Sequence, residues 1–274
     1  GGLRTTACYK NGGYDNPLLT VITVVFNDVS SIEATIKSVL EQSYDNVEYI
    51  VIDGGSTDGT LDVICRYDNA LDYWISSRDE GIYCAFNRGI TLATGEVVGI
   101  LNSGDLYYPQ TLQVVVDLYK KHKGELIITG GMDKILENGD ILTRSVTHKD
   151  LDNLNKLMTI NHPSTFVSLD VYKKYGLFDQ KYFIPGDYDF LKRVIKSGVN
   201  CLLIEDNLSL MSYGGVSDKF CFKWFMLDQI RLIIKFPEDA IYVLYFSTRR
   251  IVKVLMLYLK KTIRESIPFI NFNK

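Results

Sequence analysis

Three apolar, β-branched runs constrain the fold of this chain more than any other feature. They cover residues 18–26, 47–52 and 97–101. Runs of this composition are typical of strands that are buried on both faces of a sheet. Helical patterns separate them, and strands that alternate with helices favour a parallel sheet covered by helices on both sides. The sequence therefore predicts an α/β fold around a mostly parallel central sheet.

The remaining pattern predicts shorter elements and three regions. We expect helices at 32–40, 61–67, 85–93, 169–175 and 187–197, and short strands at 71–76, 125–129, 141–144 and 165–168. The turn at Asn138-Gly139 favours a hairpin between two of these strands. We divide the chain into an N-terminal tail (1–17), a main domain (18–217) and a C-terminal helical segment (218–274).

Charge and cysteine content exclude several classes of protein. The 30 Lys and Arg residues are balanced by 33 Asp and Glu residues, for a net charge of −3. This balance argues against nucleic acid as a partner. The five cysteines have no CxxC spacing, which suggests neither a zinc site nor a disulfide framework. Scattered thiols fit a reducing compartment, so we expect a cytoplasmic location.

Two polar segments follow predicted strands directly, where ligands bind in open α/β sheets. The first runs from Asp53 to Thr60, and the Asp53 carboxylate there can accept hydrogen bonds from a base or a ribose. The second runs from Asn102 to Asp105, and the Asp105 carboxylate can hold a divalent cation. The alternatives are an ordinary turn with a helix cap at the first segment and a Ser-Gly-Asp turn at the second.

Two further positions are candidates for acid–base chemistry. Asp187 opens a predicted helix and is a candidate general base, whereas Asp189 suits a first turn favoured by the helix dipole. Asp187 as a helix cap is the structural alternative. His162 is one of three histidines, and a single histidine is more often structural than catalytic.

Nine short segments occur in the order and spacing of a known family. They lie at 23–27, 53–60, 79–90, 93–96, 101–105, 162–163, 175–179, 187–190 and 214–217. Together they resemble family 2 glycosyltransferases, especially the bacterial enzymes that build capsule, O-antigen and colanic-acid-type polysaccharides. The resemblance covers about residues 20–217 and implies a GT-A fold and an inverting hexosyl- or N-acetylhexosaminyltransferase.

The resemblance also implies a role for individual residues. The nucleotide or donor sugar would contact Val25, Asn27, Asp53, Asp79, Asn87, Arg88 and Asn102. Asp105 would bind Mn²⁺ or Mg²⁺, and Asp187 would deprotonate the acceptor hydroxyl. His162 would lie on the acceptor or metal side. The donor would be a UDP-sugar rather than a GDP-sugar, and the acceptor a glycan or a lipid-linked glycan.

Two positions depart from the family pattern. The segment Ser103-Gly104-Asp105 carries one carboxylate where relatives usually carry two, and Cys84 stands where relatives often have Asp. These departures leave a second interpretation, an inactive nucleotide-sugar-binding homologue that serves as an assembly partner. A dinucleotide-binding dehydrogenase is disfavoured because no GxGxxG follows the first strand. A nucleotidyltransferase would need a Gly- and Lys-rich loop there, and residues 27–30 do not form one.

The C-terminal segment alternates apolar and aromatic residues with cations. Arg249, Arg250 and Lys253 interrupt its most apolar window, so it lacks the ~20 uncharged residues of a spanning helix. An apolar helix with Lys and Arg suits the surface of an anionic membrane. We therefore expect peripheral association with the inner face of the plasma membrane. Packing on the main domain or a homodimer contact through these helices is the alternative.

Overall fold

The structure is a computed structural model that describes residues 1–13, 15–153, 159–215, 222–245, 247–249 and 251–252. The chain divides into two compact units, Gly1–Phe220 and Cys221–Lys274. Each unit is described by itself. The predicted division at residue 218 stays a prediction.

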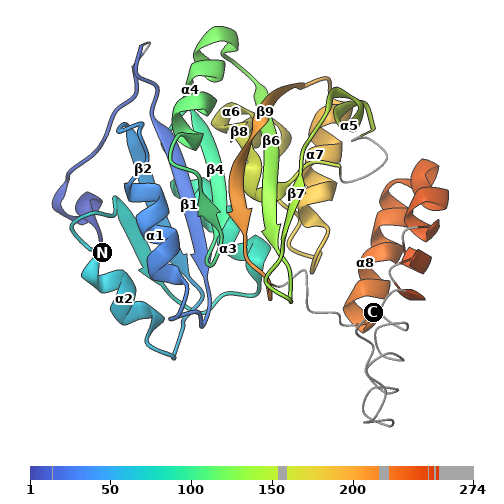
Figure 1. Ribbon diagram of the computed structural model, residues 1–274, viewed down its shortest axis with the longest axis horizontal. Helices are drawn as coiled ribbons and strands as arrows, with labels where there is room; N and C mark the ends of the chain where they lie inside the picture. The colour runs from blue at the N-terminus through green and yellow to red at the C-terminus, as the bar shows by residue number, and fades with distance from the viewer. Residues whose placement is uncertain (14, 154–158, 216–221, 246, 250, 253–274) are drawn as a thin grey trace. The chain divides into compact units, whose positions relative to one another are not determined.

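The first half of the large unit is a parallel sheet, as the sequence predicts. Strand β1 (Leu19–Val25) lies between β2 (Val47–Asp53) and β4 (Val97–Asn102), and β3 (Tyr73–Ser76) pairs with β2. All residues of β1 and β2 are buried, which explains why both strands are continuous β-branched runs. The parallel register places the carboxyl ends of these strands at one edge of the sheet (Figure 1).

The second half of the sheet adds antiparallel pairs. Strand β8 (Thr165–Ser168) is antiparallel to both β4 and β6 (Leu126–Ile135), while β9 (Asn200–Met211) is parallel to β6. Short strands β5 (Leu106–Tyr107) and β7 (Ile141–Arg144) pair antiparallel with β9 and β6. The strand order is β3-β2-β1-β4-β8-β6-β9-β5, with β7 beside β6. The predicted α/β class is confirmed, but parallel pairing dominates only among the first four strands.

Strand β9 is absent from the sequence prediction, and its pairing explains why. Gly130 of β6 pairs with Ile204, but the next residue, Gly131, pairs with Asn207. Glu205 and Asp206 are therefore extra residues that bulge out of the ladder, and both are exposed. Two charged residues in mid-strand hide the alternating pattern by which a strand is recognised.

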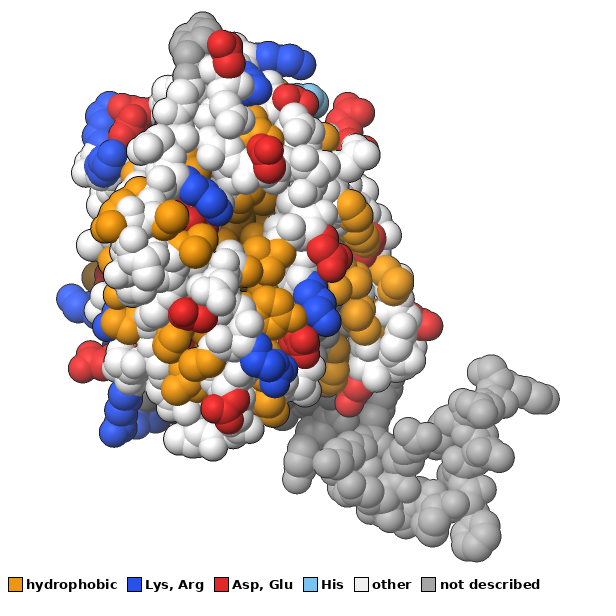
Figure 2. Space-filling view, turned by 90° about the vertical axis from the view of Figure 1, so that its left-hand side faces the viewer, with side chains coloured by type: hydrophobic (Ala, Val, Ile, Leu, Met, Phe, Trp, Pro, Cys, Tyr) orange, Lys and Arg blue, Asp and Glu red, His pale blue; other side chains and the backbone are white. Residues whose placement is uncertain are grey.

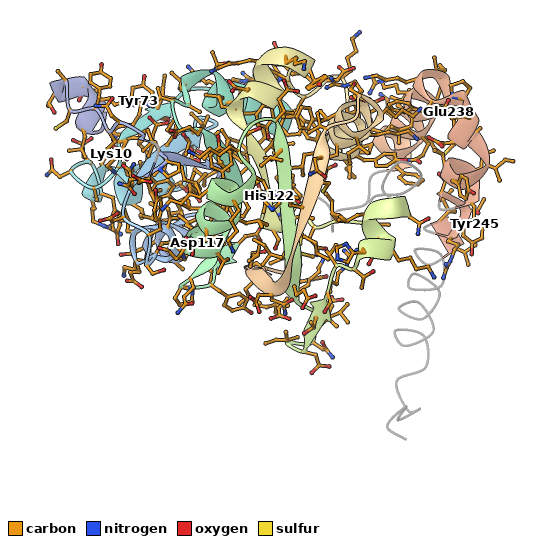
Figure 3. The ribbon with its side chains drawn as sticks, turned by 90° about the horizontal axis from the view of Figure 1, so that it is seen from above. Lys10, Tyr73, Asp117, His122, Glu238 and Tyr245 are labelled. Carbon is orange, nitrogen blue, oxygen red and sulfur yellow. The ribbon has the colours of Figure 1, made fainter. Side chains whose placement is uncertain are left out.

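Helices cover both faces of the sheet (Figures 1 and 3). One face packs on α1 (Ile32–Leu40), α2 (Thr60–Arg66) and α4 (Thr111–His122). The opposite face packs on α3 (Ile82–Leu92), α6 (Leu169–Tyr175) and α7 (Gly186–Lys196). Helix α3 approaches β1 closely, because a Cβ on Gly89 would lie 2.4 Å from the Ile22 side chain. Short helices η1 (Leu3–Thr6), α5 (His148–Asn153) and η2 (His162–Ser164) complete the unit.

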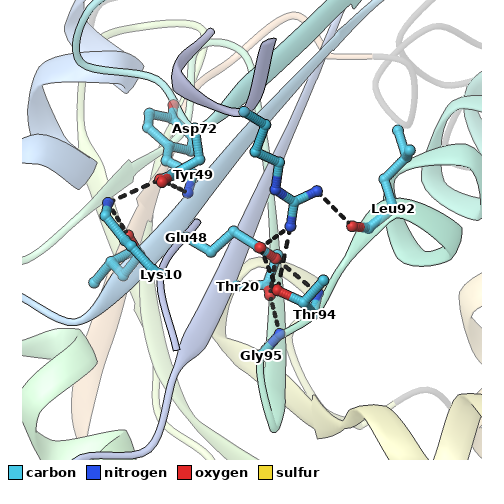
Figure 4. A network of polar contacts seen from close by, with 10 residues as sticks. Lys10, Thr20, Glu48, Tyr49, Asp72, Leu92, Thr94 and Gly95 are labelled. Carbon is cyan, nitrogen blue, oxygen red and sulfur yellow. Dashed lines mark hydrogen bonds and ion pairs between the residues drawn. The ribbon is translucent and has the colours of Figure 1, made fainter. Parts of the chain in front are cut away.

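The N-terminal segment is anchored on the sheet by two ion pairs (Figure 4). Arg4 pairs with Glu48, whose carboxylate also accepts hydrogen bonds from the Thr20 hydroxyl at 2.7 Å and the Thr94 N–H at 2.8 Å. Lys10 Nζ lies 2.8 Å from Asp72 Oδ2. Glu48 and Asp72 are 1% and 2% exposed, so each depends on its partner to offset the cost of burying a charge. Residues 1–17 are thus part of the domain, on the side where Lys10 and Tyr73 are labelled in Figure 3.

Charged side chains of both signs are interspersed on the face of the molecule that Figure 2 shows. This face lies on the side of the N-terminal segment and α2 in Figure 1. The mixture of signs agrees with the near balance of charge in the sequence. It does not form the continuous basic surface on which nucleic-acid binding depends.

The small unit contains α8 (Phe222–Lys235) and a 3₁₀ turn at Pro237–Asp239, followed by further helical residues. Glu238 and Tyr245, labelled in Figure 3, belong to this unit. Across the described ranges, no helix has both the length and the apolar character needed to cross a membrane. Residues 253–274, the last part of the predicted C-terminal segment, lie outside the described residues, as does Arg250.

Removing Glu48 tests how strongly the N-terminal segment depends on its buried charges. Glu48→Ala leaves the Arg4 guanidinium and the Thr94 N–H without their shared acceptor, so we expect a loss of about 3 kcal/mol in the free energy of unfolding. Urea denaturation measures this loss. Glu33→Ala is the matched control, because the ion pairs of Glu33 with Lys37 and Arg66 are at the surface. Equal stability of both variants would contradict the assignment.

Candidate active site

The candidate site lies where the parallel strands end. Val24 of β1 is in register with Asn102 of β4, and Val25 is in register with Asp53 of β2. Since β8 is antiparallel to β4, the residues that precede β8 lie at the same edge, among them His162. Four of the sequence-predicted segments are therefore brought together by strand register alone.

Asp53 and Asn27 hold the loop that follows β2. The Asp53 side chain is fully buried and accepts hydrogen bonds from the Ser56 N–H at 3.1 Å, the Ser56 hydroxyl at 2.5 Å and the Ser76 hydroxyl. Asn27 has a positive φ of 50°, donates its N–H to the Ser56 hydroxyl at 2.7 Å and accepts the Thr57 N–H at 2.8 Å. In this structure both side chains shape the loop, and the predicted contact of Asp53 with a base stays a prediction.

An exposed aromatic ring lies beside this loop and was missed by sequence reasoning as a side-chain candidate. Phe26 follows the buried strand β1 yet is 64% exposed. A Cβ on Gly54 would lie 3.3 Å from the Phe26 ring and 3.0 Å from the Asp79 carboxylate. Gly54 therefore lies between this ring and this carboxylate, in contact with both. The sequence signal that could have identified Phe26 is an aromatic residue at the end of a β-branched run, directly before the polar pair Asn27-Asp28. Val25 itself is buried, and its carbonyl accepts the Gly54 N–H at 2.9 Å.

Arg88 and Asn87 are neighbours on α3, but their side chains contact different segments of the chain. The Arg88 guanidinium donates to the hydroxyl of Ser77, at the end of β3, and thus reaches toward the segment that carries Asp79. The Asn87 side chain is buried and exchanges two hydrogen bonds with the backbone of Phe178, at 2.8 and 3.0 Å. Asn87 therefore fastens the segment that leads to Asp187, whereas Arg88 lies on the predicted donor side.

The turn after β4 does not fit a metal centre held by the protein. Asp105 is 5% exposed, and its carboxylate accepts the Ser212 N–H at 3.0 Å, so it ties β5 to the end of β9. A Cβ on Gly104 would lie 3.8 Å from the carboxylate of Asp28, which in turn accepts the Ser103 hydroxyl at 2.7 Å.

Asn102 contributes a carbonyl oxygen, Oδ1, that is buried and has no hydrogen-bond partner in the described part of the chain. Among the described residues, no group of three or more His, Cys, Asp or Glu side chains is arranged to hold a metal ion. Binding of Mn²⁺ or Mg²⁺ by Asp105 therefore stays a prediction, and we derive no catalytic step through a cation.

Asp187 and His162, the two sequence-predicted candidates for acid–base chemistry, lie in the same place. Both line one small, mainly apolar pocket with Thr165, Tyr172 and Phe178. The His162 ring stacks on Phe86 of α3, with 5.1 Å between ring centroids and 8° between planes. Asp187 Oδ1 accepts the N–H of Tyr188 at 2.8 Å. The pocket wall thus orients the histidine ring while the start of α7 orients the carboxylate.

Asp187 and Asp189 both lie in the first turn of helix α7. The helix starts at Gly186, and its N-cap residue is Pro185, so Asp187 is not the N-cap residue itself, although it accepts the first-turn N–H of Tyr188. Asp189 is fully buried and pairs with Arg193 at 3.2 Å. The role of Asp187 as the general base stays a prediction.

Burial shifts both groups of the pair toward their neutral forms. Desolvation raises the pKa of Asp187, although the nearby His162 and the hydrogen bonds at the start of α7 act in the opposite direction. Desolvation also lowers the pKa of His162, against the attraction of Asp187. A carboxylate with a raised pKa is a better proton acceptor for a hydroxyl than an ordinary one.

The fold is an α/β sheet with polar loops where its parallel strands end. Residues 20–183 match the sequence family described as glycosyl transferase family 2. The chain belongs to this family and is a nucleotide-sugar-dependent glycosyltransferase with the GT-A fold. The resemblance found in the sequence motifs is thereby confirmed.

Curated relatives carry the same description. An uncharacterized glycosyltransferase of Mycobacterium tuberculosis is 31% identical over 180 residues, which cover 65% of this chain and 68% of the relative. A glycosyltransferase of PGL/p-HBAD biosynthesis from Mycobacterium bovis is 30% identical over 183 residues, which cover 64% and 68% of the two chains.

Solved structures share the fold at low sequence identity. Residues 1–349 of S. aureus TarS, in complex with UDP-GlcNAc, superpose with a TM-score of 0.64 at 17% identity, covering 79% of this chain and 66% of that one. The mannosyltransferase PcManGT of Pyrobaculum calidifontis, in complex with GDP-Man and Mn²⁺, gives a TM-score of 0.56 at 16% identity, covering 97% and 86%. At this identity the likeness establishes the fold alone.

The raised pKa of Asp187 predicts a pH-dependent effect of Asp187→Asn on stability. The folded protein holds the Asp187 proton more tightly than the unfolded chain, so the wild type loses stability as pH rises from the ordinary value of 3.8 through the raised folded value. Asparagine does not titrate, so the variant should gain stability relative to wild type across this window. Urea denaturation from about pH 4 to about pH 7 measures the difference. A variant less stable than wild type at neutral pH would contradict it.

Proposed function

We propose that this enzyme transfers a sugar, with inversion, from a UDP-sugar to a hydroxyl group of a growing, lipid-linked surface glycan. The observation that carries the proposal is the state of Asp187. This carboxylate lines a pocket, has a raised pKa and has no Lys or Arg partner within the described residues. The carboxylates of Asp53, Asp105 and Asp189 are engaged in hydrogen bonds or an ion pair that hold loops and helices together, and they do not line this pocket.

An inverting transfer needs one carboxylate rather than two. The acceptor hydroxyl attacks the anomeric carbon from the face opposite the leaving diphosphate, while a base within hydrogen-bond reach takes its proton. Asp187 in its ionised form accepts this proton, and burial among apolar residues makes it the stronger base. The neutral His162 ring beside it fixes the pocket wall without adding a positive charge that would weaken the base.

The donor and acceptor assignments are supported by the loops and by the relatives. The exposed Phe26 ring offers a face to a planar base, and Gly54 leaves room between this ring and Asp79. TarS has been solved with UDP-GlcNAc and with UDP, which favours a UDP-sugar, although PcManGT was solved with GDP-Man. The named mycobacterial relatives belong to PGL/p-HBAD biosynthesis, which is consistent with a lipid-linked acceptor.

Asp187→Asn tests the proposed base. We expect turnover to fall at least about 100-fold with donor affinity within about threefold, because a base acts in the transition state and not in donor binding. Release of UDP from a panel of UDP-sugars with a lipid-linked acceptor, together with calorimetry for UDP, separates the two quantities. Asp170→Asn, at an exposed carboxylate on α6, is the control and should behave as wild type.

Two results would overturn this proposal. Full turnover in Asp187→Asn would remove the base assignment. Binding of UDP-sugars without turnover by the wild type on any acceptor would instead favour the inactive, assembly-partner homologue that Cys84 and the single carboxylate at Asp105 suggest.

We also propose that the small unit binds the surface of an anionic membrane. On α8, Leu227, Ile230 and Ile234 follow one another at helical spacing and are all exposed, the last by 75%. Ile241, further along, is 80% exposed. Exposed cations accompany these apolar residues, among them Lys223, Lys235 and Arg249. Apolar side chains combined with cations are typical of helices that lie in the headgroup region.

Replacing exposed isoleucines tests membrane binding. The pair Ile234→Asp and Ile241→Asp should lower co-sedimentation with vesicles that contain anionic lipid at least about fivefold, because each charge opposes burial in the interface. Ile141→Asp, which alters an equally apolar, exposed residue of β7, is the matched control. Equal binding of both proteins would end the membrane proposal. A loss of dimer in the double variant, with vesicle binding unchanged, would assign these helices to a homodimer contact.

A further inference from the structure

Tyr83 lies on the first turn of α3 and reaches the segment that carries the proposed base. Its side chain is 5% exposed. The hydroxyl donates to the carbonyl of Ile184 and accepts the N–H of Gly186 at 2.9 Å and the N–H of Asp187 at 3.4 Å. One buried hydroxyl therefore joins three backbone positions, two just before Asp187 and one at Asp187 itself.

The Tyr83 ring is held as firmly as its hydroxyl. It packs edge-on against Phe86, with 5.6 Å between centroids, and stacks on Phe178 at 5.7 Å. Gly186 packs on the ring so closely that a Cβ there would lie 2.7 Å from it. The ring has little freedom to move, so the hydroxyl is a fixed point for the start of α7.

Helix α3 also fixes the other groups of the pocket. Phe86 stacks on His162, and Asn87 binds the backbone of Phe178 in both directions. The N-cap residue of the same helix is Gly81, which donates its N–H to Asp79 at 3.1 Å on the predicted donor side. A single helix thus contacts the segment of Asp79 at its N-cap and the segment of Asp187 two residues later.

We infer that Tyr83 is a positioning residue, which holds the Asp187 carboxylate at the acceptor hydroxyl through the backbone of residues 184–187 and through a hydrogen bond to the carboxyl group itself. It acts on turnover rather than on donor binding. The inference rests on the proposed function of Asp187. Its consequence is that a loss of one hydroxyl group, with the ring retained, slows the transfer step.

Tyr83→Phe is the direct test, because it keeps the ring packing and removes the hydrogen bonds of the hydroxyl. We expect kcat to fall at least about tenfold with the donor KM within about threefold. Gly186→Ala is a second variant that keeps the hydroxyl but displaces the backbone from the ring, and it should show the same split between kcat and KM. Tyr49→Phe is the matched control, since it removes another fully buried tyrosine hydroxyl, 3.0 Å from Thr23 Oγ1, far from α7 in the sheet core. It should lower stability and leave kcat unchanged.

The outcomes separate this inference from the function on which it rests. Wild-type kcat in Tyr83→Phe, alongside a large loss in Asp187→Asn, would overturn the positioning role and leave the base intact. A raised donor KM with unchanged kcat would also overturn it. If Tyr83→Phe does not fold, the kcat of Gly186→Ala decides. Full turnover in Asp187→Asn would instead reject the proposed base itself.

Discussion

The parallel register of β1 between β2 and β4 is the constraint on which the rest of this structure depends. It places Val25, Asp53 and Asn102 at one edge of the sheet, and each of these residues is followed by a loop that faces the same space. Buried β-branched residues on both faces of β1 and β2 make a shift of this register costly, since a shift exposes apolar side chains. The position of the ligand loops is therefore set by core packing rather than by the loops themselves.

The loops are in turn stiffened by polar residues that themselves are buried. Asp53 holds Ser56 and Ser76, Asn27 holds Thr57, and Asp105 holds Ser212. Such side chains cost free energy unless every oxygen finds a donor, and here the donors are backbone N–H and hydroxyl groups of neighbouring loops. Asp187 differs, because no Lys or Arg among the described residues offsets the cost of burying its charge, and burial therefore raises its pKa. The fold thus separates carboxylates that build the site from the one that suits chemistry.

The sequence predicts the elements that have a regular pattern and the segments that have a motif. The three apolar runs, the Asn138-Gly139 hairpin and the grouping of segments after strands all follow from residue types and spacing. Strand β9 does not, because its bulge at Glu205 and Asp206 breaks the alternation. Helix α4 is also absent from the sequence prediction, although its buried residues recur at helical spacing. They are Leu112, Val115, Val116 and Tyr119.

The candidate site is predicted in its location but less well in the role of each residue. Burial of Asp105 and the pairing of Asn87 with Phe178 depend on segments more than 90 residues away, which no local pattern reveals. Phe26 belongs to an apolar run but is exposed, whereas Tyr83 lies in a motif but is buried, and neither outcome follows from the local sequence. A motif identifies which residues belong to a site, whereas tertiary contacts decide which of them face the ligand.

The central claim is that a nucleotide sugar binds at the carboxyl ends of β1, β2 and β3. Hydrogen–deuterium exchange with and without saturating UDP tests it most directly, because it reports on every loop without a known acceptor. The account predicts slower exchange in residues 26–29, 54–58 and 77–81, with α4 unchanged. Protection confined to other segments, or no protection at UDP concentrations that saturate binding in calorimetry, would contradict it.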